Sequence, residues 1–243
     1  MIAPELEQLS VMSLPVHGSN DYIGWLMTRL HQGEGSHIVT LNAEMSIQAD
    51  QNPALKQVIR QANLVLPDGA GIVLYFLLKG KRLKRCPGIE LAAALLEHAN
   101  PEDTAFFYGG SPNVAEAAAR SWQKQAPRLA IAGTQHGYLT PEEQLAFQQR
   151  LKELQPSLIF VGLGVPRQEL WISAHRHLCP HAIWIGVGGS FDIWAGAKSR
   201  APAWLRNNHL EWLYRLYQEP WRWRRMMALP KFAWKALTYS EKK

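Results

Sequence analysis

One carboxylate in the sequence stands where a buried strand would end and a helix would begin. Asp68 lies between Pro67 and Gly69 in the segment LVLPDGAG (64–71), after three apolar residues and before another apolar run. Proline and glycine both favour turns, which would hold the carboxylate in a fixed place. From this position alone two interpretations stay open: a carboxylate at a ligand site, where it could act as a base, or a cap for the following helix.

Other polar or small residues follow apolar runs in the same way. Thr40 and Asn42 come at the end of HIVTL (37–41), and Gln168 follows LIFVGL (158–163). The remaining candidates are small or cationic residues where such runs end: Gly109, Gly110, Gly164, Arg167, Gly186, Gly188 and Gly189. Because backbone N–H groups at helix N-termini can approach phosphate oxygens where side chains are small, this pattern predicts a protein that binds a phosphate or a nucleotide.

An alternation of strands and helices would position these residues. Apolar, β-branched or aromatic runs predict six strands, at 37–41, 64–66, 105–109, 129–133, 158–163 and 182–187. Helical patterns lie between them, at 52–62, 88–99, 111–125 and 140–154. Ser111 and Thr140 would cap the last two, each followed by proline, and Glu143 would complete a capping box. Runs that are apolar on both faces predict an α/β fold with a parallel sheet flanked by helices. Its ligand would lie beyond the carboxyl ends of the strands.

Three short motifs suggest other sites, and each lacks a defining feature. GLGVPR (162–167) begins like a dinucleotide fingerprint, but Arg167 occupies the third glycine position. GAKS (196–199) lacks the spacing of a P-loop, and there is no Asp-x-Asp pair to clamp a metal on a sugar nucleotide. HRHLCPH (175–181) could offer metal ligands, but residues two apart on a helix point to different faces. We expect a helix end there and no bound metal.

The C-terminal segment differs from the rest in charge and aromatic content. Residues 203–243 hold nine Lys and Arg against three Glu, which accounts for the whole net charge of +6, and five of the ten Trp. Basic, aromatic, amphipathic segments lie at membrane interfaces, although this composition could also bind nucleic acid or pack in a dimer. We divide the chain into an α/β body, residues 1–198, and a membrane-associating helical appendage, residues 199–243.

Cysteine usage and hydropathy indicate a cytoplasmic protein. Cys86 and Cys179 lie far apart and give no disulfide framework, as is usual in a reducing compartment. The N-terminus lacks the basic and apolar regions of a signal peptide. The longest uncharged apolar run is far shorter than the about 20 residues that span a bilayer.

Eight motifs occur in an order that resembles one family. They are TLNAE (40–44), LPDGAG (66–71), RCPG-x-E (85–90), HGY (136–138), GxGxPRQE (162–169), GVGGSFD (186–192), RAP (200–202) and LEWLYRL (210–216). Together they resemble the WecG/TagA/CpsF glycosyltransferases, glycosyltransferase family 26, over residues 37–230. The sequence departs from the family pattern at Arg167, Glu90 and His209, where lysine, aspartate and glycine are common.

The resemblance implies a Rossmann-like α/β body with a C-terminal appendage. It also implies an inverting, metal-independent transfer of a sugar from a UDP-sugar to a polyprenyl-diphosphate-linked GlcNAc in cell-surface polysaccharide synthesis. The sugar would be an N-acetylmannosamine derivative or a related hexose. No cofactor is implied, and the enzyme would lie on the inner face of the cell membrane through residues 203–243. Homo-oligomers are possible, and no nucleic-acid partner is expected.

The resemblance also implies roles for the candidate residues. Asp68 would take the proton of the acceptor hydroxyl, and Thr40 and Asn42 would orient a sugar. Arg85 and the glycine-rich turns, with Arg167, would hold the donor and its leaving diphosphate in place of a metal, and Gln168 would hydrogen-bond to the donor or the base. Arg85 could equally belong to a solvated basic loop, KGKRLKR (79–85). Three arginines of the appendage would complete the site when it docks: Arg215, Arg222 and Arg225.

Two other functions are alternatives to the transferase. A membrane or nucleic-acid adaptor would bind liposomes or RNA through the basic segment and have no affinity for UDP. A nicotinamide-dependent oxidoreductase would bind NAD(P).

Overall fold

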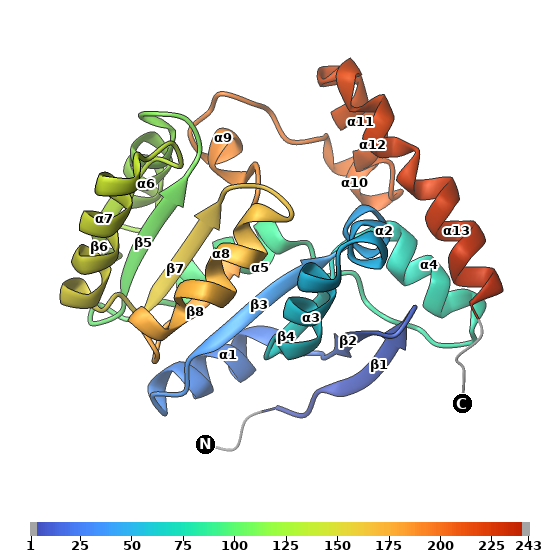
Figure 1. The fold of residues 1–243 in the computed structure, drawn as a ribbon, viewed down its shortest axis with the longest axis horizontal. Coiled ribbons are helices and arrows are strands. Elements are labelled where there is room, and N and C mark those ends of the chain that lie inside the picture. The colour runs from blue at the N-terminus through green and yellow to red at the C-terminus, as the bar shows by residue number, and fades with distance from the viewer. Residues whose placement is uncertain (1–3, 240–243) are drawn as a thin grey trace.

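The computed structural model describes residues 4–239, so residues 1–3 and 240–243, the outer ends of the two predicted regions, lie outside it. Its centre is a six-stranded sheet, all parallel, in the order β4-β3-β8-β7-β5-β6 (Figure 1). The strands are β3 (Ser36–Leu41), β4 (Leu64–Pro67), β5 (Thr104–Gly109), β6 (Ala130–Gln135), β7 (Leu158–Gly162) and β8 (Ile183–Gly186). All six predicted strands and the α/β fold are confirmed.

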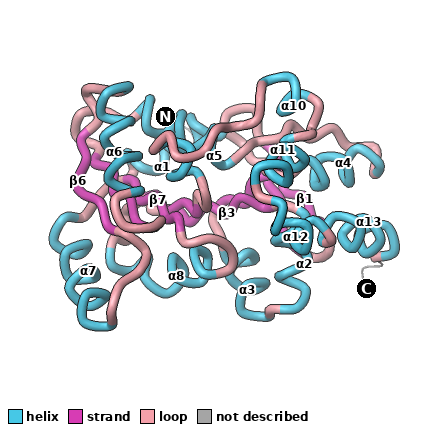
Figure 2. Tube along the Cα trace, turned by 90° about the horizontal axis from the view of Figure 1, so that it is seen from above, coloured by secondary structure: helices cyan, strands magenta, loops and turns pink. Residues whose placement is uncertain are grey.

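Helices cover both faces of this sheet (Figure 2). One face carries α1 (Tyr22–His31), α5 (Gly88–His98) and α6 (Val114–Gln125), and the other carries α3 (Pro53–Gln61), α7 (Pro141–Leu154) and α8 (Arg167–His175). Neighbouring strand residues alternate between the two cores, so that Phe107 packs in the first and Phe106 in the second. Burial on both faces explains why the strands read as continuous apolar runs.

The two predicted helix caps have different outcomes. Thr140 caps α7 in a capping box, because its side chain accepts from the Glu143 N–H while Glu143 accepts from the Thr140 N–H at 2.8 Å. The prediction for Ser111 is wrong, since α6 begins only at Val114. Asn113 adopts a left-handed conformation, with φ of 70°, which asparagine tolerates but which interrupts a helix.

A β-hairpin that the sequence analysis did not predict precedes the sheet. Strands β1 (Glu7–Val11) and β2 (Leu14–Gly18) pair antiparallel, and the two turn residues between them have positive φ angles. The turn lacks the glycine or asparagine that usually marks such a hairpin. The hairpin protects the edge strand β4, because His17 Nδ1 accepts from the Val65 N–H at 2.9 Å.

The C-terminal helices return to the body beside α2 (Ala43–Gln51) and α4 (Ala70–Leu78). They are α10 (Ala203–Asn207), α11 (Glu211–Gln218), the short 3-10 turn Pro220–Arg222, α12 (Trp223–Met226) and α13 (Ala228–Thr238). Phe232 and Ala236 of α13 are buried in the same core as β3 and β4. Within residues 4–239 no helix has the length and apolarity to span a bilayer. The boundary predicted at residue 198 stays a prediction.

Candidate functional site

Two polar cavities lie beyond the carboxyl ends of β3, β4 and β8, where α11 meets the body. The first, here called the cationic cavity, has a volume of about 100 Å³ and is lined among others by Thr40, Gly186 and Arg200. The second, the junction cavity, has about 140 Å³ and reaches Asn42 and α4. Five charged side chains line both cavities: Asp68, Arg85, Glu211, Arg215 and Arg222. The two cavities therefore meet at Asp68 and its arginines.

Asp68 is held at this meeting point by backbone contacts. Its N–H donates to the Leu41 carbonyl at 3.0 Å, and its Oδ1 accepts from the Gly88 N–H, in the first turn of α5, at 3.3 Å. The capping interpretation for α4 is wrong, because Gly69 is the N-cap and no side chain of the described residues, Asp68 included, caps that helix. Burial raises the pKa of Asp68, and the charges of Arg215 and Arg85 offset this only in part. A carboxylate with a raised pKa is a stronger base.

A buried glutamate of α11 organises the arginines beside Asp68. Glu211 accepts from Arg85 at 2.9 Å and from Arg215 at 2.8 Å, while Arg85 Nε also donates to the Asp68 carbonyl at 2.6 Å. Burial would raise the pKa of Glu211, but the two arginines lower it to about 2. This network fixes α11, and with it the C-terminal helices, to the end of β4.

The cationic cavity carries more positive than negative charge. The cations that line it are Arg85, Lys198, Arg200, Arg215 and Arg222, against the acids Asp68, Glu211 and Glu219. Lys198 donates to Glu219 at 2.9 Å and to Asp192 at 3.2 Å. A concave, low-dielectric site of this sign attracts anions.

Three of the predicted residues line the cationic cavity on the sheet side. Thr40 is buried and donates to the Gly186 carbonyl at 3.4 Å, and Gly189 is the N-cap residue of α9 (Ser190–Trp194). Asn42 lines the junction cavity instead, and its Oδ1 caps α2 by accepting from the Met45 N–H at 2.9 Å. A contact of Asn42 with a sugar would therefore come from its amide nitrogen.

Gln168 has a different place from the one predicted. It is fully buried, lines neither cavity, and accepts with Oε1 from the N–H groups of Gly164 and Gly188 at 3.1 and 3.0 Å. Its Nε2 donates to Glu169 at 2.7 Å. Because these contacts use both ends of the amide, Gln168 joins two loops, and the N–H groups of Gly164 and Gly188 are directed at it rather than at a phosphate.

The other glycine-rich turn is also used for packing. The Gly110 N–H donates to the Gly162 carbonyl at 3.0 Å, and Gly109 has a φ of 131°. A side chain at Gly109 would come within 2.5 Å of the Gly162 backbone, so glycine allows β5 and β7 to approach each other. Neither glycine lines the two polar cavities, and Arg167 is exposed outside them.

The arginines of the predicted appendage divide in two groups. Arg215 and Arg222 line both cavities, which is the position predicted for them when the C-terminal segment packs against the body. Arg225 lies outside the lining and donates to Glu44 of α2 at 2.6 Å. It therefore anchors α12 to the body.

Several lining residues were not among the predicted ones. They are Ser190, Lys198, Ser199, Arg200, Glu211 and Glu219. The signal for three of them was available, because Ser190, Arg200 and Glu211 lie within the motifs GVGGSFD, RAP and LEWLYRL.

The described residues contain no group of three or more His, Cys, Asp and Glu side chains that could hold a metal ion. In the segment HRHLCPH, His175 accordingly stacks on Trp171 and its Nδ1 lies 2.8 Å from the Trp171 carbonyl. The segment ends a helix, as expected.

Fold and site together define an α/β protein with a cation-lined site at the carboxyl edge of its sheet. The chain matches the model of the Glycosyl transferase WecG/TagA/CpsF family over residues 9–243 and belongs to that family. The family assignment makes the protein a glycosyltransferase, and it excludes the adaptor and nicotinamide alternatives as its main function.

Relatives from three organisms are called N-acetylglucosaminyldiphosphoundecaprenol N-acetyl-beta-D-mannosaminyltransferase. The one from Bacillus spizizenii is 40% identical over 207 residues, covering 84% of this chain and 80% of the relative. The one from Bacillus subtilis is 35% identical over 229 residues, covering 92% and 89%. The one from Staphylococcus aureus is 37% identical over 201 residues, covering 82% and 78%.

Proposed function

We propose that the protein transfers N-acetylmannosamine, or a closely related sugar, from a UDP-sugar to a lipid-linked GlcNAc with inversion at the transferred carbon. The observation that carries this proposal is the position of Asp68, which lines the cationic cavity and the junction cavity at once. A base at that point can serve an acceptor in one cavity and a donor in the other. The names of the three relatives supply the sugars.

The donor diphosphate would occupy the cationic cavity. Five cationic side chains line it, and three of them, Arg85, Arg215 and Arg222, also reach the junction cavity. Fixed cations stabilise the charge that develops on a leaving diphosphate. We therefore propose that these side chains perform the task that a divalent metal has in other sugar-nucleotide enzymes.

Asp68 would act as the base. A β-linked product made from an α-linked UDP-sugar requires attack from the opposite side of the ring, with the base beside the attacking hydroxyl. The raised pKa of Asp68, caused by burial, suits a group that must accept a proton. Positioned bases of this kind contribute about 10²- to 10⁴-fold in rate.

The exposed aromatic side chains of the C-terminal helices would rest on the inner face of the cell membrane, where a lipid-linked acceptor is held. Trp204, Trp221 and Trp234 are 63, 70 and 72% exposed. Tryptophan is favoured at the boundary of headgroups and acyl chains. The site would then face a head group at the membrane surface.

The test is a transfer assay with purified protein, UDP-N-acetylmannosamine and a GlcNAc-diphospho-lipid, run in EDTA and in Mg²⁺. We expect equal release of UDP in both, and a product heavier than the acceptor by one N-acetylhexosamine. Transfer that requires Mg²⁺ would contradict the metal-independent part of the proposal, and absence of transfer from a panel of UDP-sugars would contradict the donor class.

A further inference from the structure

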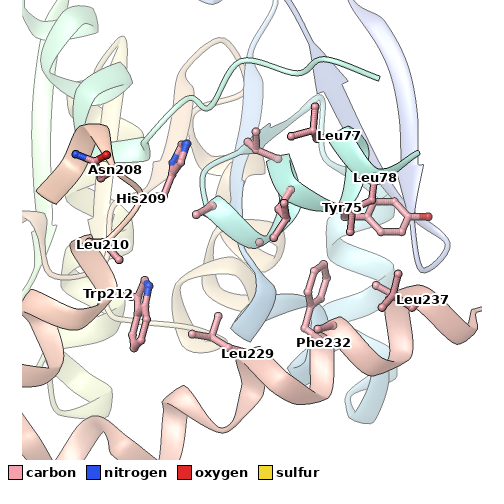
Figure 3. A pocket seen from close by; sticks show the side chains of 16 residues that line it. Tyr75, Leu77, Leu78, Asn208, His209, Leu210, Trp212, Leu229, Phe232 and Leu237 are labelled. Atoms are coloured by element: carbon pink, nitrogen blue, oxygen red, sulfur yellow. The ribbon is translucent and has the colours of Figure 1, made fainter. Parts of the chain in front are cut away.

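An apolar groove of about 460 Å³ runs between α4 and α13 (Figure 3). Phe232 is buried against α4, whereas Leu74, Leu77 and Leu237 of the groove lining are more than half exposed. Its size is within the about 300–1,000 Å³ usual for sites of small ligands. Large leucines left exposed along a groove are unfavourable unless something covers them.

The groove is continuous with the catalytic region. It shares five lining residues with the junction cavity: Ala70, Gly71, His209, Trp212 and Leu229. The junction cavity in turn contains Asp68 and Arg222. The apolar groove therefore adjoins the cavity that holds the carboxylate and its arginines.

We propose that this groove binds the first isoprene units of the acceptor lipid, an inference that rests on the proposed function. The acceptor consists of a sugar, a diphosphate and a hydrocarbon chain, in that order. The junction cavity, which adjoins the groove, holds the base Asp68 together with Arg215 and Arg222. These two arginines line both polar cavities, so they can face the acceptor diphosphate as well as the donor diphosphate. The groove thus holds the lipid chain next to the diphosphate, while the rest of the chain stays in the membrane.

To test whether the groove itself binds the hydrocarbon chain of the acceptor, acceptors with short and long hydrocarbon chains are compared in the absence of a membrane. Ala233 lines the groove and is exposed, so Ala233→Trp fills the groove without disturbing a buried contact. Thr238→Trp adds the same side chain to α13 at an exposed position outside the groove lining and is the matched control. Both variants are first compared with the unaltered protein by thermal melting.

The substrates are two water-soluble acceptors, GlcNAc-diphospho-ethyl and GlcNAc-diphospho-farnesyl, assayed without detergent. For the unaltered protein we expect a KM for the farnesyl acceptor lower by on the order of tenfold or more, because each buried methylene adds affinity. Ala233→Trp should lose this preference and Thr238→Trp should keep it, with the KM for the UDP-sugar unchanged in both. A farnesyl acceptor carrying a benzophenone should label residues 70–78 and 229–237.

Other results overturn the inference. An Ala233→Trp variant that keeps the chain-length preference, or labelling confined to other segments, excludes the groove as the lipid site. A change of oligomeric state in Ala233→Trp, measured by light scattering, would mark the groove as an interface between two copies of the chain. Transfer to neither acceptor by the unaltered protein would contradict the proposed function itself, whereas equal transfer to both would contradict only the groove.

Discussion

At the scale of single residues, the proposed chemistry depends on Asp68. We predict that Asp68→Asn lowers kcat by about 10²- to 10⁴-fold, because the amide keeps the shape of the side chain but cannot accept the proton. The affinity for UDP, measured by calorimetry, should change little. Asp21→Asn is the control and should retain kcat, since Asp21 caps α1 outside both cavities and asparagine caps a helix equally well.

The pH dependence of kcat provides a second measure of the same group. Because burial raises the pKa of Asp68, the protonated, inactive form persists above the usual pKa of an aspartate. We therefore expect kcat to fall as the pH is lowered, with a midpoint above that usual value. If kcat does not fall as the pH is lowered, Asp68 is not the base. The same conclusion follows if the Asp68→Asn variant has the kcat of the unaltered protein.

The candidate site was predictable from the sequence only where a residue's place in the fold determines its role. Asp68 follows β4 and Thr40 lies near the carboxyl end of β3, and both line the cationic cavity. Gln168 has the same kind of place, yet its amide is directed inward to two loops. The sequence predicts at which edge of the sheet a residue lies, but not the hydrogen-bond partner of its side chain. For this reason the sequence pattern predicts a phosphate as the partner of Gly164 and Gly188, whereas their N–H groups donate to Gln168.

At the scale of elements, the pair Gln168–Glu169 connects the loop after β7 to the loop after β8. Glu169 is buried, its Oε1 accepts from Gln168, and its Oε2 has no hydrogen-bond partner among the described residues. Burial raises the pKa of Glu169 to about 7, although the hydrogen bond from Gln168 opposes this. The ionised form is therefore disfavoured in the folded protein.

This gives a prediction for stability against pH. The contribution of Glu169 is fully present below its unfolded pKa and is lost as the pH rises toward 7, a change on the order of 3 kcal/mol. Glu169→Gln cannot ionise, so the free energy of unfolding of the variant relative to the unaltered protein should rise by that order between pH 4.5 and pH 8. Urea unfolding at both pH values measures it, and a difference independent of pH would contradict the burial of a titrating Glu169.

The attachment of α11 has the opposite dependence. Arg215 and Arg85 lower the pKa of Glu211 to about 2 against the effect of burial, so its contribution is present above the unfolded pKa of about 4.5 and is lost as the pH falls toward 2. Glu211→Gln should cost on the order of 3 kcal/mol of unfolding free energy at pH 7 and little near pH 2. Removing one negative charge from the cationic cavity should also tighten UDP binding. Weaker binding of UDP would contradict this, and would show that Glu211 supports UDP binding by holding Arg85 and Arg215 in place more than it opposes binding through its charge.

Elements were predicted where local pattern and tertiary environment agree. The six parallel strands are apolar on both faces because helices cover both, and this leaves a clear signal. The hairpin of β1 and β2 gave no such signal, because Met12 and Ser13 occupy positive-φ turn positions that glycine or asparagine usually fill. Its place is set by packing on the edge strand β4, which is a long-range effect.

At the scale of the whole molecule, the structure changes the meaning of the basic C-terminal segment. Five of its cations form ion pairs with acids of the protein: Arg206 with Glu90, Arg215 with Glu211, Arg222 with Glu219, Arg225 with Glu44 and Lys235 with Asp50. The pairs of Arg206, Arg225 and Lys235 hold the C-terminal helices to the body, whereas Arg215 and Arg222 pair with glutamates of the same segment and line the site. Part of the positive charge of this segment is therefore used within the molecule.

Membrane association should then depend on the exposed aromatic residues more than on charge. We predict that replacing Trp221 and Trp223, which are 70 and 56% exposed, by serine lowers binding to vesicles of phosphatidylglycerol and phosphatidylethanolamine by on the order of tenfold, because apolar burial at the interface is lost. Lys231 forms no ion pair within residues 4–239, and neutralising it with Lys231→Gln should have a smaller effect, since one basic residue near anionic lipid is worth about 1 kcal/mol.

Vesicle co-sedimentation at low and high salt separates the two contributions. Salt screens the attraction between exposed charges and lipids, so binding through aromatic side chains should persist at high salt. Tyr138→Ser, at a body residue that is 66% exposed, is the control and should leave binding unchanged. If instead salt abolishes binding while the double tryptophan variant binds normally, the basic residues make the contact, and the ion pairs of the C-terminal helices must open at the membrane surface to allow it.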